Sequence, residues 1–408
     1  MNITAQRLLA LIVVAAGLLT ACGYAAVIAL SGDRNEAGEQ LGALAGFALF
    51  GAAVGCFWLF ATFRIQGAPG GTLRLPPAWL SALIFIAFTG AGFGLAAVDR
   101  ALYLAPLLTI LGFTAVGAFF LRLAATWMPK RRLPLRNLVL PGIWGVFVAP
   151  LILMVVQGAA VVVFVIAAVA GILAENPDFE VDPNLEDRVT AYFEESGTDA
   201  TSTELPEIVA ESPTIALTLF SVVAIMAPLS EELVKAFGAI LVLTRLPVVT
   251  RADALFAAVG SSLGFALFEG VGYTLGAGAA WHQLMLVRAP VVVMHIAATA
   301  IIVIGWHRMR ATGRGFIPYF AAGTALHAGW NALYVGFIYS LTGLESGSDP
   351  SAGQALGIMA MVLLLGALFI AGLAWFLGAA HKAGIDERHD PATVEQTYQA
   401  ETSYAASG

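Results

Sequence analysis

Continuous apolar runs of about 20 residues recur along this chain, and each is long enough to cross the ~30 Å hydrocarbon core of a bilayer as one helix. Of the 408 residues, 59% are hydrophobic and 12% are charged, whereas soluble domains carry about 25% charged residues. A soluble globular fold is therefore excluded. We expect an all-α, polytopic helical bundle with about ten transmembrane helices, in residues 8–30, 41–63, 79–98, 101–122, 143–173, 213–246, 252–278, 283–306, 316–341 and 354–380.

The charges between these runs predict the topology. If ten spans alternate, the loops rich in Lys and Arg all fall on one side, and the acidic segment 175–211 falls on the other. Basic loops mark the cytoplasmic side of a membrane. We therefore expect a multi-pass protein of a bacterial cell membrane with both termini in the cytoplasm.

Polar residues also divide the chain into parts. The first five spans carry almost no polar side chains, and the last residues are polar, aromatic-poor and without periodicity, as in disordered segments. The expected organisation is an N-terminal five-span scaffold (1–173), an acidic extracytoplasmic loop (174–212), a functional core (213–341), a final span (342–380) and a disordered cytoplasmic tail (381–408).

Two of the expected spans are longer than one crossing and contain a proline, Pro150 or Pro228. Proline removes a backbone donor and clashes with the preceding turn, so each span should kink or break there. Whether these spans are single or broken helices stays open at this point.

The functional core concentrates the ionisable residues that the apolar runs contain. A charge inside a bilayer costs several kcal/mol, so such residues usually mark a functional site. At ~1.5 Å of rise per residue, the carboxylates and histidines of four successive spans lie within roughly 8 Å of one another in depth. The candidate site residues are Glu231, Glu232, Lys235, Glu269, His295, His327 and Asn331.

The spacing on each helix suggests how these side chains could act. Glu231 and Lys235 are four residues apart with the acid first, the favourable order for an ion pair. Glu232 lies three residues from the same lysine. One of the two acids can be neutralised locally, and the other, about 100° around the helix, could face a cavity as a general base. His327 and Asn331 are also four apart and share a face.

The same residues resemble a known family. Glu-Glu-x-x-Lys at 231–235, Phe-x-x-x-Glu at 265–269, the isolated His295 and His-x-x-x-Asn at 327–331, in this order, resemble the PrsW family of intramembrane proteases. That family is related to the type II CAAX-prenyl and bacteriocin-processing membrane proteases. The resemblance covers about residues 213–341. The CAAX-type relatives typically have histidine where Glu269 stands and arginine where Lys235 stands, so their catalytic roles do not transfer to these two residues.

The resemblance implies an intramembrane protease that cleaves membrane-embedded or membrane-adjacent protein substrates, in regulated proteolysis of a signalling protein. Glu231 and Glu232 would be the base and its orienting partner, with one of them held by Lys235. His327 and Asn331 would steady the oxyanion, since donors aimed at developing charge lower the barrier. Glu269 and His295 would position the water or protonate the leaving amine.

A metal-dependent version of the reaction stays equally open. Two histidines and a glutamate can supply a three-ligand catalytic zinc site, here Glu269, His295 and His327. The chain lacks His-Glu-x-x-His, the usual helical zinc signature. A single divalent metal such as zinc is thus one alternative, and water activated by glutamate alone is the other.

Two function classes compete with a protease. An ion- or proton-coupled transporter would use the same carboxylates and histidines as a relay, but such folds usually show repeated halves, and here the first half is apolar and unmatched. A noncatalytic scaffold that recruits a partner through the acidic loop leaves the polar cluster unexplained. The expected partners are a membrane-protein substrate and the lipid bilayer, without nucleic acid, and the oligomeric state stays open.

Overall fold

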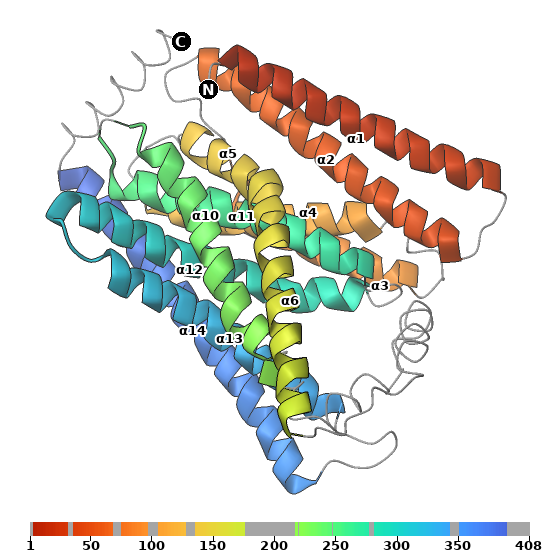
Figure 1. Cartoon of the computed structure of the whole chain (residues 1–408). Coiled ribbons are helices and arrows are strands. Elements are labelled where there is room, and N and C mark those ends of the chain that lie inside the picture. Colours follow the sequence, from red (N-terminus) through yellow and green to blue (C-terminus); the bar gives the residue numbers. More distant parts are fainter. Residues whose placement is uncertain are drawn as a thin grey trace. The chain divides into compact units, whose positions relative to one another are not determined.

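The computed structural model describes residues 3–31, 36–67, 75–96, 105–127, 135–175, 217–218, 220–246, 248–276, 281–342 and 351–389. Within these ranges every regular element is helical (Figure 1), which confirms the all-α prediction. The helices are α1 (Ile3–Ser31), α2 (Glu36–Gly67), α3 (Ala78–Ala96), α4 (Ala105–Thr126), α5 (Leu135–Ile143), α6 (Ala149–Glu175), α10 (Ala227–Leu243), α11 (Arg251–Gly276), α12 (Trp281–Thr312), α13 (Phe316–Thr342) and α14 (Ala352–His389), with π turns η2 (Trp144–Val148) and η3 (Val222–Met226).

The chain folds as two compact units that share helices α10, α13 and α14. The first unit comprises Met1–Pro150, Val234–Gly323 and Gly372–Gly408, and the second comprises Leu151–Leu233 and Thr324–Ala371. In the first unit, α1 and α2 lie side by side as an antiparallel pair (Figure 1), while α11 and most of α12 are buried. The second unit contains α6, η3, the start of α10, most of α13 and the first part of α14.

Helix α11 begins with a reciprocal cap. The backbone N–H of Thr250 donates to Asp253 Oδ2 at 2.9 Å, and the N–H of Asp253 donates to Thr250 Oγ1 at 3.2 Å, which is the capping-box arrangement. The other carboxylate oxygen of Asp253 accepts from Asn137 Nδ2 at 3.0 Å. The start of α11 is therefore attached to α5, which sets the position of the later turns of α11.

Small residues then bring α5 and α11 into backbone contact. A Cβ added at Gly260 would overlap with the carbonyl oxygen of Leu138, and one added at Gly264 would overlap with that of Gly142. Only glycine fits at such close approaches of two backbones. This contact places Glu269, which follows Gly264 on α11, at a defined distance from the neighbouring helices.

Neither Pro150 nor Pro228 ends its helix, but the turn before each of them is irregular. Each follows a π turn: Ala149 N–H bonds to Trp144 O before Pro150, and Ala227 N–H bonds to Val222 O before Pro228. The wider turn accommodates the proline ring and its missing donor. The helical path thus continues through both prolines, which answers the question that the sequence left open.

Eight of the described helices are long and apolar enough to cross a membrane, and the protein is a multi-pass membrane protein. The expected spans 213–246 and 316–341 are not among the eight. Helix α10 has only 17 residues, and α13 carries His327 and Asn331, which reduce its apolar character. The ten-span count and the orientation of the termini remain predictions.

The C-terminal boundary differs from the expectation. Helix α14 continues to His389, so the prediction of a disordered tail from 381 is wrong for residues 381–389. Asp386 lies 3.3 Å from Arg251, and the His381 ring meets Trp127 edge-on; these contacts, all within the first unit, support the extra turns. The rest of the predicted tail, residues 390–408, lies outside the described residues. Residues 176–212 of the predicted acidic loop also lie outside them.

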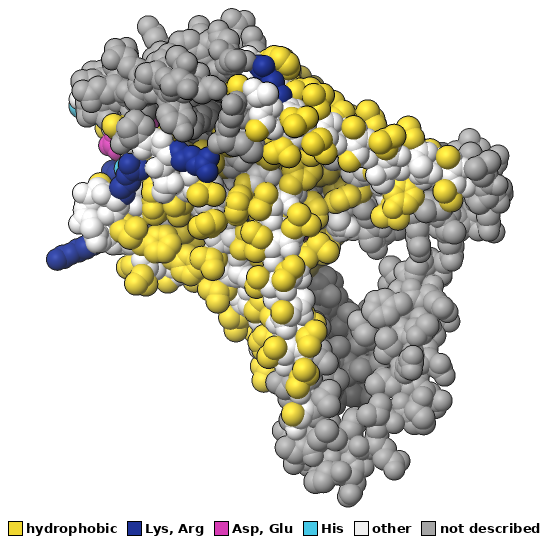
Figure 2. Space-filling model, turned by 45° about the horizontal axis from the view of Figure 1, so that its top comes forward, with side chains coloured by type: hydrophobic (Ala, Val, Ile, Leu, Met, Phe, Trp, Pro, Cys, Tyr) yellow, Lys and Arg dark blue, Asp and Glu magenta, His cyan; other side chains and the backbone are white. Residues whose placement is uncertain are grey.

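The described surface is largely apolar. On the face in Figure 2, hydrophobic side chains cover most of the surface that is not grey. Exposed large side chains include Leu19, Val155 and Ile317, each more than 70% accessible. A contiguous apolar surface of this kind suits contact with lipid rather than water.

Candidate active site

The paired glutamates lie in the first turns of α10 and are buried. Glu231 is 7% exposed, and Glu232 and Lys235 are fully buried. An isolated buried charge is costly unless it is paired or bonded. The contacts of these three side chains therefore decide what the site can do.

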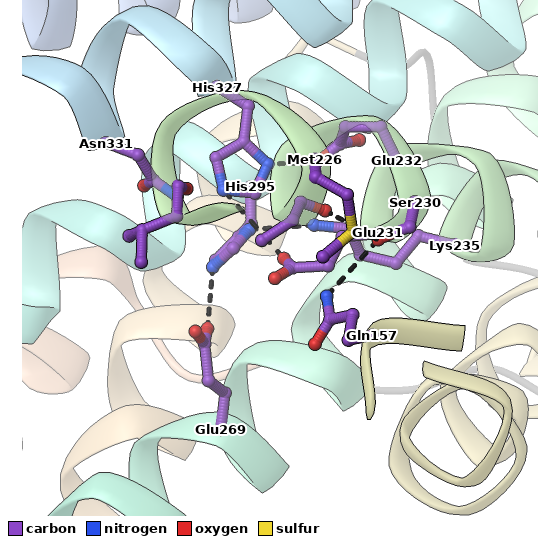
Figure 3. A network of polar contacts seen from close by, with 12 residues as sticks. Gln157, Met226, Ser230, Glu231, Glu232, Lys235, Glu269, His295, His327 and Asn331 are labelled. Atoms are coloured by element: carbon purple, nitrogen blue, oxygen red, sulfur yellow. Dashed lines mark hydrogen bonds and ion pairs between the residues drawn. The ribbon is translucent and has the colours of Figure 1, made fainter. Parts of the chain in front are cut away.

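Within the second unit, His327 joins both glutamates (Figure 3). Its Nδ1 lies 2.9 Å from Glu232 Oε1, and its Nε2 lies 3.8 Å from Glu231 Oε2. An ionised carboxylate only accepts hydrogen bonds, so His327 Nδ1–H donates to Glu232. We call Glu231, Glu232 and His327 the carboxylate–histidine cluster.

Within the first unit, four ionisable groups form a continuous chain. His295 Nδ1 lies 2.8 Å from Lys235 Nζ, and His295 Nε2 lies 2.8 Å from Glu269 Oε2. The same Glu269 oxygen lies 2.6 Å from Arg288 Nη2. We call Lys235, His295, Glu269 and Arg288 the lysine–arginine chain.

The charged groups on either side of His295, the Lys235 ammonium and the Glu269 carboxylate, set its tautomer. Glu269 accepts from Arg288 and from His295 Nε2–H, so His295 Nδ1 presents its lone pair to the Lys235 ammonium. Aromatic faces cover the two cations: Lys235 Nζ lies 4.8 Å from the centre of the Phe265 ring, and Arg288 Cζ lies 4.3 Å from that of Tyr273. Such contacts stabilise buried cations.

Sequence reasoning missed the part that Arg288 plays. The candidate site residues did not include it, whereas the structure pairs it with Glu269. The available signal was its spacing of seven residues from His295, since seven residues make two turns and put both on one face of α12.

Backbone contacts hold the second half of α10 in the first unit. Trp144 Nε1 donates to Val234 O at 3.0 Å, and Ser261 Oγ donates to Lys235 O at 2.8 Å. At the end of α10, Arg310 donates to the carbonyls of Leu243 and Leu246. None of these donors was identifiable from sequence, because each acts on a backbone carbonyl rather than on a polar side chain.

Asn331 contacts the backbone as well. Its Nδ2 donates to Val223 O, within η3, at 3.0 Å. The seven predicted site residues therefore divide among the carboxylate–histidine cluster, the lysine–arginine chain and this single contact. Helix α10 carries members of both groups, since Glu231 and Glu232 are followed one turn later by Lys235.

Comparison with known proteins identifies the family. The sequence pattern of the PrsW family intramembrane metalloproteases matches residues 133–365, which is more than half of the chain. The chain belongs to the PrsW family. No curated protein and no solved structure matches it.

Membership in the PrsW family makes this protein an intramembrane peptide hydrolase, which decides against the transporter and scaffold alternatives. The matched region also begins earlier than the motifs indicated, because it includes α5, η2 and α6. Two residues of this stretch, Trp144 in η2 and Gln157 in α6, contact α10. Trp144 bonds to Val234 O, and Gln157 Nε2 lies 3.2 Å from Ser230 Oγ.

The donor atoms of this PrsW-family protein suit a divalent metal. In the carboxylate–histidine cluster, His327 Nε2 and Glu231 Oε2 are 3.8 Å apart, close to the roughly 3.3 Å between two ligand atoms of a tetrahedral zinc ion. Each histidine is also oriented by a carboxylate, Glu232 for His327 and Glu269 for His295, as is usual for metal-binding histidines. His295 Nδ1 already meets a cationic group, the Lys235 ammonium.

Proposed function

We propose that this PrsW-family protein hydrolyses a peptide bond of a membrane-embedded or membrane-adjacent protein at the carboxylate–histidine cluster. The observation that carries the proposal is the buried contact of His327 with both glutamates. Two carboxylates and an oriented imidazole can bind and deprotonate a water molecule. A role in regulated proteolysis of a signalling protein rests on the family resemblance alone.

The metal ligands in this proposal are Glu231, His295 and His327, all of which offer suitable atoms. Glu231 replaces Glu269 of the sequence-based set because Glu269 Oε2 already serves Arg288 and His295. His295 would bind the metal through Nδ1, which requires the Lys235 ammonium to leave that nitrogen. A bound divalent ion such as zinc would supply Lewis-acid chemistry, activating water and polarising the scissile carbonyl.

The protein's own residues then divide the remaining tasks. Glu232 holds the Nδ1–H tautomer of His327, so that Nε2 is the atom that would bind the metal, beside Glu231. Glu269 performs the same task for His295. Lys235 is a cationic donor one turn after the glutamates, and we assign it the stabilisation of the developing oxyanion.

Helix α10 carries the groups on which the proposal depends. Glu231 and Lys235 lie about 6 Å apart along the axis of one helix, at 1.5 Å of rise per residue. Lys235 contacts His295 and Glu231 lies near His327. Helix α10 thus carries a residue that contacts His295, Lys235, and a residue that lies near His327, Glu231.

Water activated by glutamate alone is the remaining alternative. In that case Glu231 is the base and His327 orients it, and no metal is needed. The family description favours the metal-dependent version.

Cleavage of a single-span test substrate by detergent-purified protein tests the proposal. We expect Glu231→Gln to abolish cleavage, because the amide neither binds a metal well nor accepts the proton. Glu232→Gln should lower the rate by roughly 10–100-fold, as is usual when an orienting partner is altered. Asp386→Asn is the matched control, since this carboxylate is half exposed and pairs with Arg251. Full cleavage by the Glu231→Gln variant would refute the proposed centre.

A further inference from the structure

The π turn before Pro228 leaves one backbone carbonyl without a helical donor. In an α-helix Val223 O would accept from the N–H of Ala227, but that N–H bonds to Val222 O. In a π-helix Val223 O would accept from residue 228, which is proline and has no N–H. Neither helical pattern therefore provides a donor for Val223 O.

Asn331 supplies the missing donor. Its Nδ2 lies 3.0 Å from Val223 O, and a backbone carbonyl away from water needs such a partner. His327, one turn earlier on α13, contacts Glu232 and lies near Glu231. Two successive turns of α13 thus attach to the η3–α10 segment, at Val223 before Pro228 and at Glu232 after it. Figure 3 shows the side chains of Asn331 and His327.

We propose that Asn331 is a positioning residue, which satisfies the carbonyl freed by the π turn and so sets where Glu231 and Glu232 stand relative to His327. This role replaces the oxyanion-binding role that the sequence suggested for Asn331. It rests on the proposed function only in so far as the two glutamates are catalytic.

A double-mutant cycle with Pro228→Ala tests the proposal. Alanine restores an N–H at residue 228, so Val223 O regains a backbone donor whether the segment becomes α-helical or stays π-helical. Asn331→Leu keeps the branched shape of the side chain and removes its donor. In the natural background it should lower Tm and reduce kcat by roughly tenfold, as expected for a part-buried carbonyl left without a donor, while KM changes little.

In the Pro228→Ala background, Asn331→Leu should leave Tm and kcat nearly unchanged, because its bond is no longer needed. Ser340→Ala is the control on the same helix: Ser340 bonds to Gly336 O, away from η3, so its effect should be the same in both backgrounds. Equal losses from Asn331→Leu in both backgrounds would overturn the positioning role and favour a direct contact with the oxyanion.

The Tm part of the cycle does not depend on the proposed reaction. If Pro228→Ala alone abolishes cleavage, the coupling in Tm still decides the role of Asn331. If instead Glu231→Gln retains cleavage, the proposed function fails while the Tm coupling stands on its own.

Discussion

At the scale of single residues, the site consists of matched charges rather than isolated ones. Glu269 lies between Arg288 and His295, and both side chains of the Glu269–Arg288 pair are less than a fifth exposed. Removing one partner of a buried ion pair costs far more than removing both, because the remaining charge is left uncompensated. The lysine–arginine chain should therefore respond to single and double substitutions in different ways.

We predict that Arg288→Met lowers the free energy of unfolding by about 3–5 kcal/mol, the usual cost of breaking a buried pair. The double variant Arg288→Met/Glu269→Gln should recover much of this loss, because no charge remains to be compensated. Chemical denaturation of the detergent-solubilised protein measures both values. Losses that simply add in the double variant would show that Arg288 and Glu269 do not interact.

The residue scale also shows how far spacing alone can reach. Helical periodicity placed His327 with Asn331, and Glu231 with Lys235, on shared helix faces, because four residues return to the same face. It could not identify partners on other helices. Asn331 was expected at the oxyanion but contacts Val223 O, and Arg288, which was not among the predicted site residues, binds Glu269. Such partners depend on how the helices pack, which a single sequence does not specify.

At the scale of helices, two devices place α10 and α11. Prolines predicted kinks, and the structure contains π turns instead, since a π turn removes the clash without ending the helix. The glycines of α11 permit backbone contact with α5. The prolines and glycines could be located in the sequence. The carbonyl groups that the π turns leave without a helical donor, and those that the glycines approach, could not.

We predict that Gly260→Ala destabilises the protein by about 1–3 kcal/mol, the usual cost of overpacking, because the added Cβ overlaps with Leu138 O. Gly272→Ala is a matched control on the same helix, since nothing lies within 4 Å of a Cβ there, and it should be neutral or slightly stabilising. Thermal unfolding of the two variants gives the comparison. If Gly260→Ala is as stable as Gly272→Ala, the α5–α11 contact is not as close as described.

At the scale of the whole molecule, composition and apolar runs were sufficient to predict a helical membrane protein. Two of the four helices that carry candidate site residues, α10 and α13, are not among the eight that apolarity and length identify, whereas α11 and α12 are. Helix α10 is short, and polar residues inside an apolar run weaken the membrane signal.

The topology gives a prediction at this scale. After replacement of Cys22 and Cys56, single cysteines introduced at Asp199 and Ala406 should be labelled from opposite sides of sealed cells, because five spans are expected between them. An impermeant maleimide added outside should reach the first position only. Labelling of both positions from one side would require an even number of spans between them.

The most direct measurement for the central claim is elemental analysis of the purified protein together with its cleavage activity. The account predicts close to one divalent metal, zinc or a chemical equivalent, per chain in the natural protein and in the Asp386→Asn control. His327→Ala should lose both the metal and the activity, and chelation should abolish cleavage reversibly. Full cleavage by exhaustively metal-free protein would contradict a metal centre at Glu231, His295 and His327.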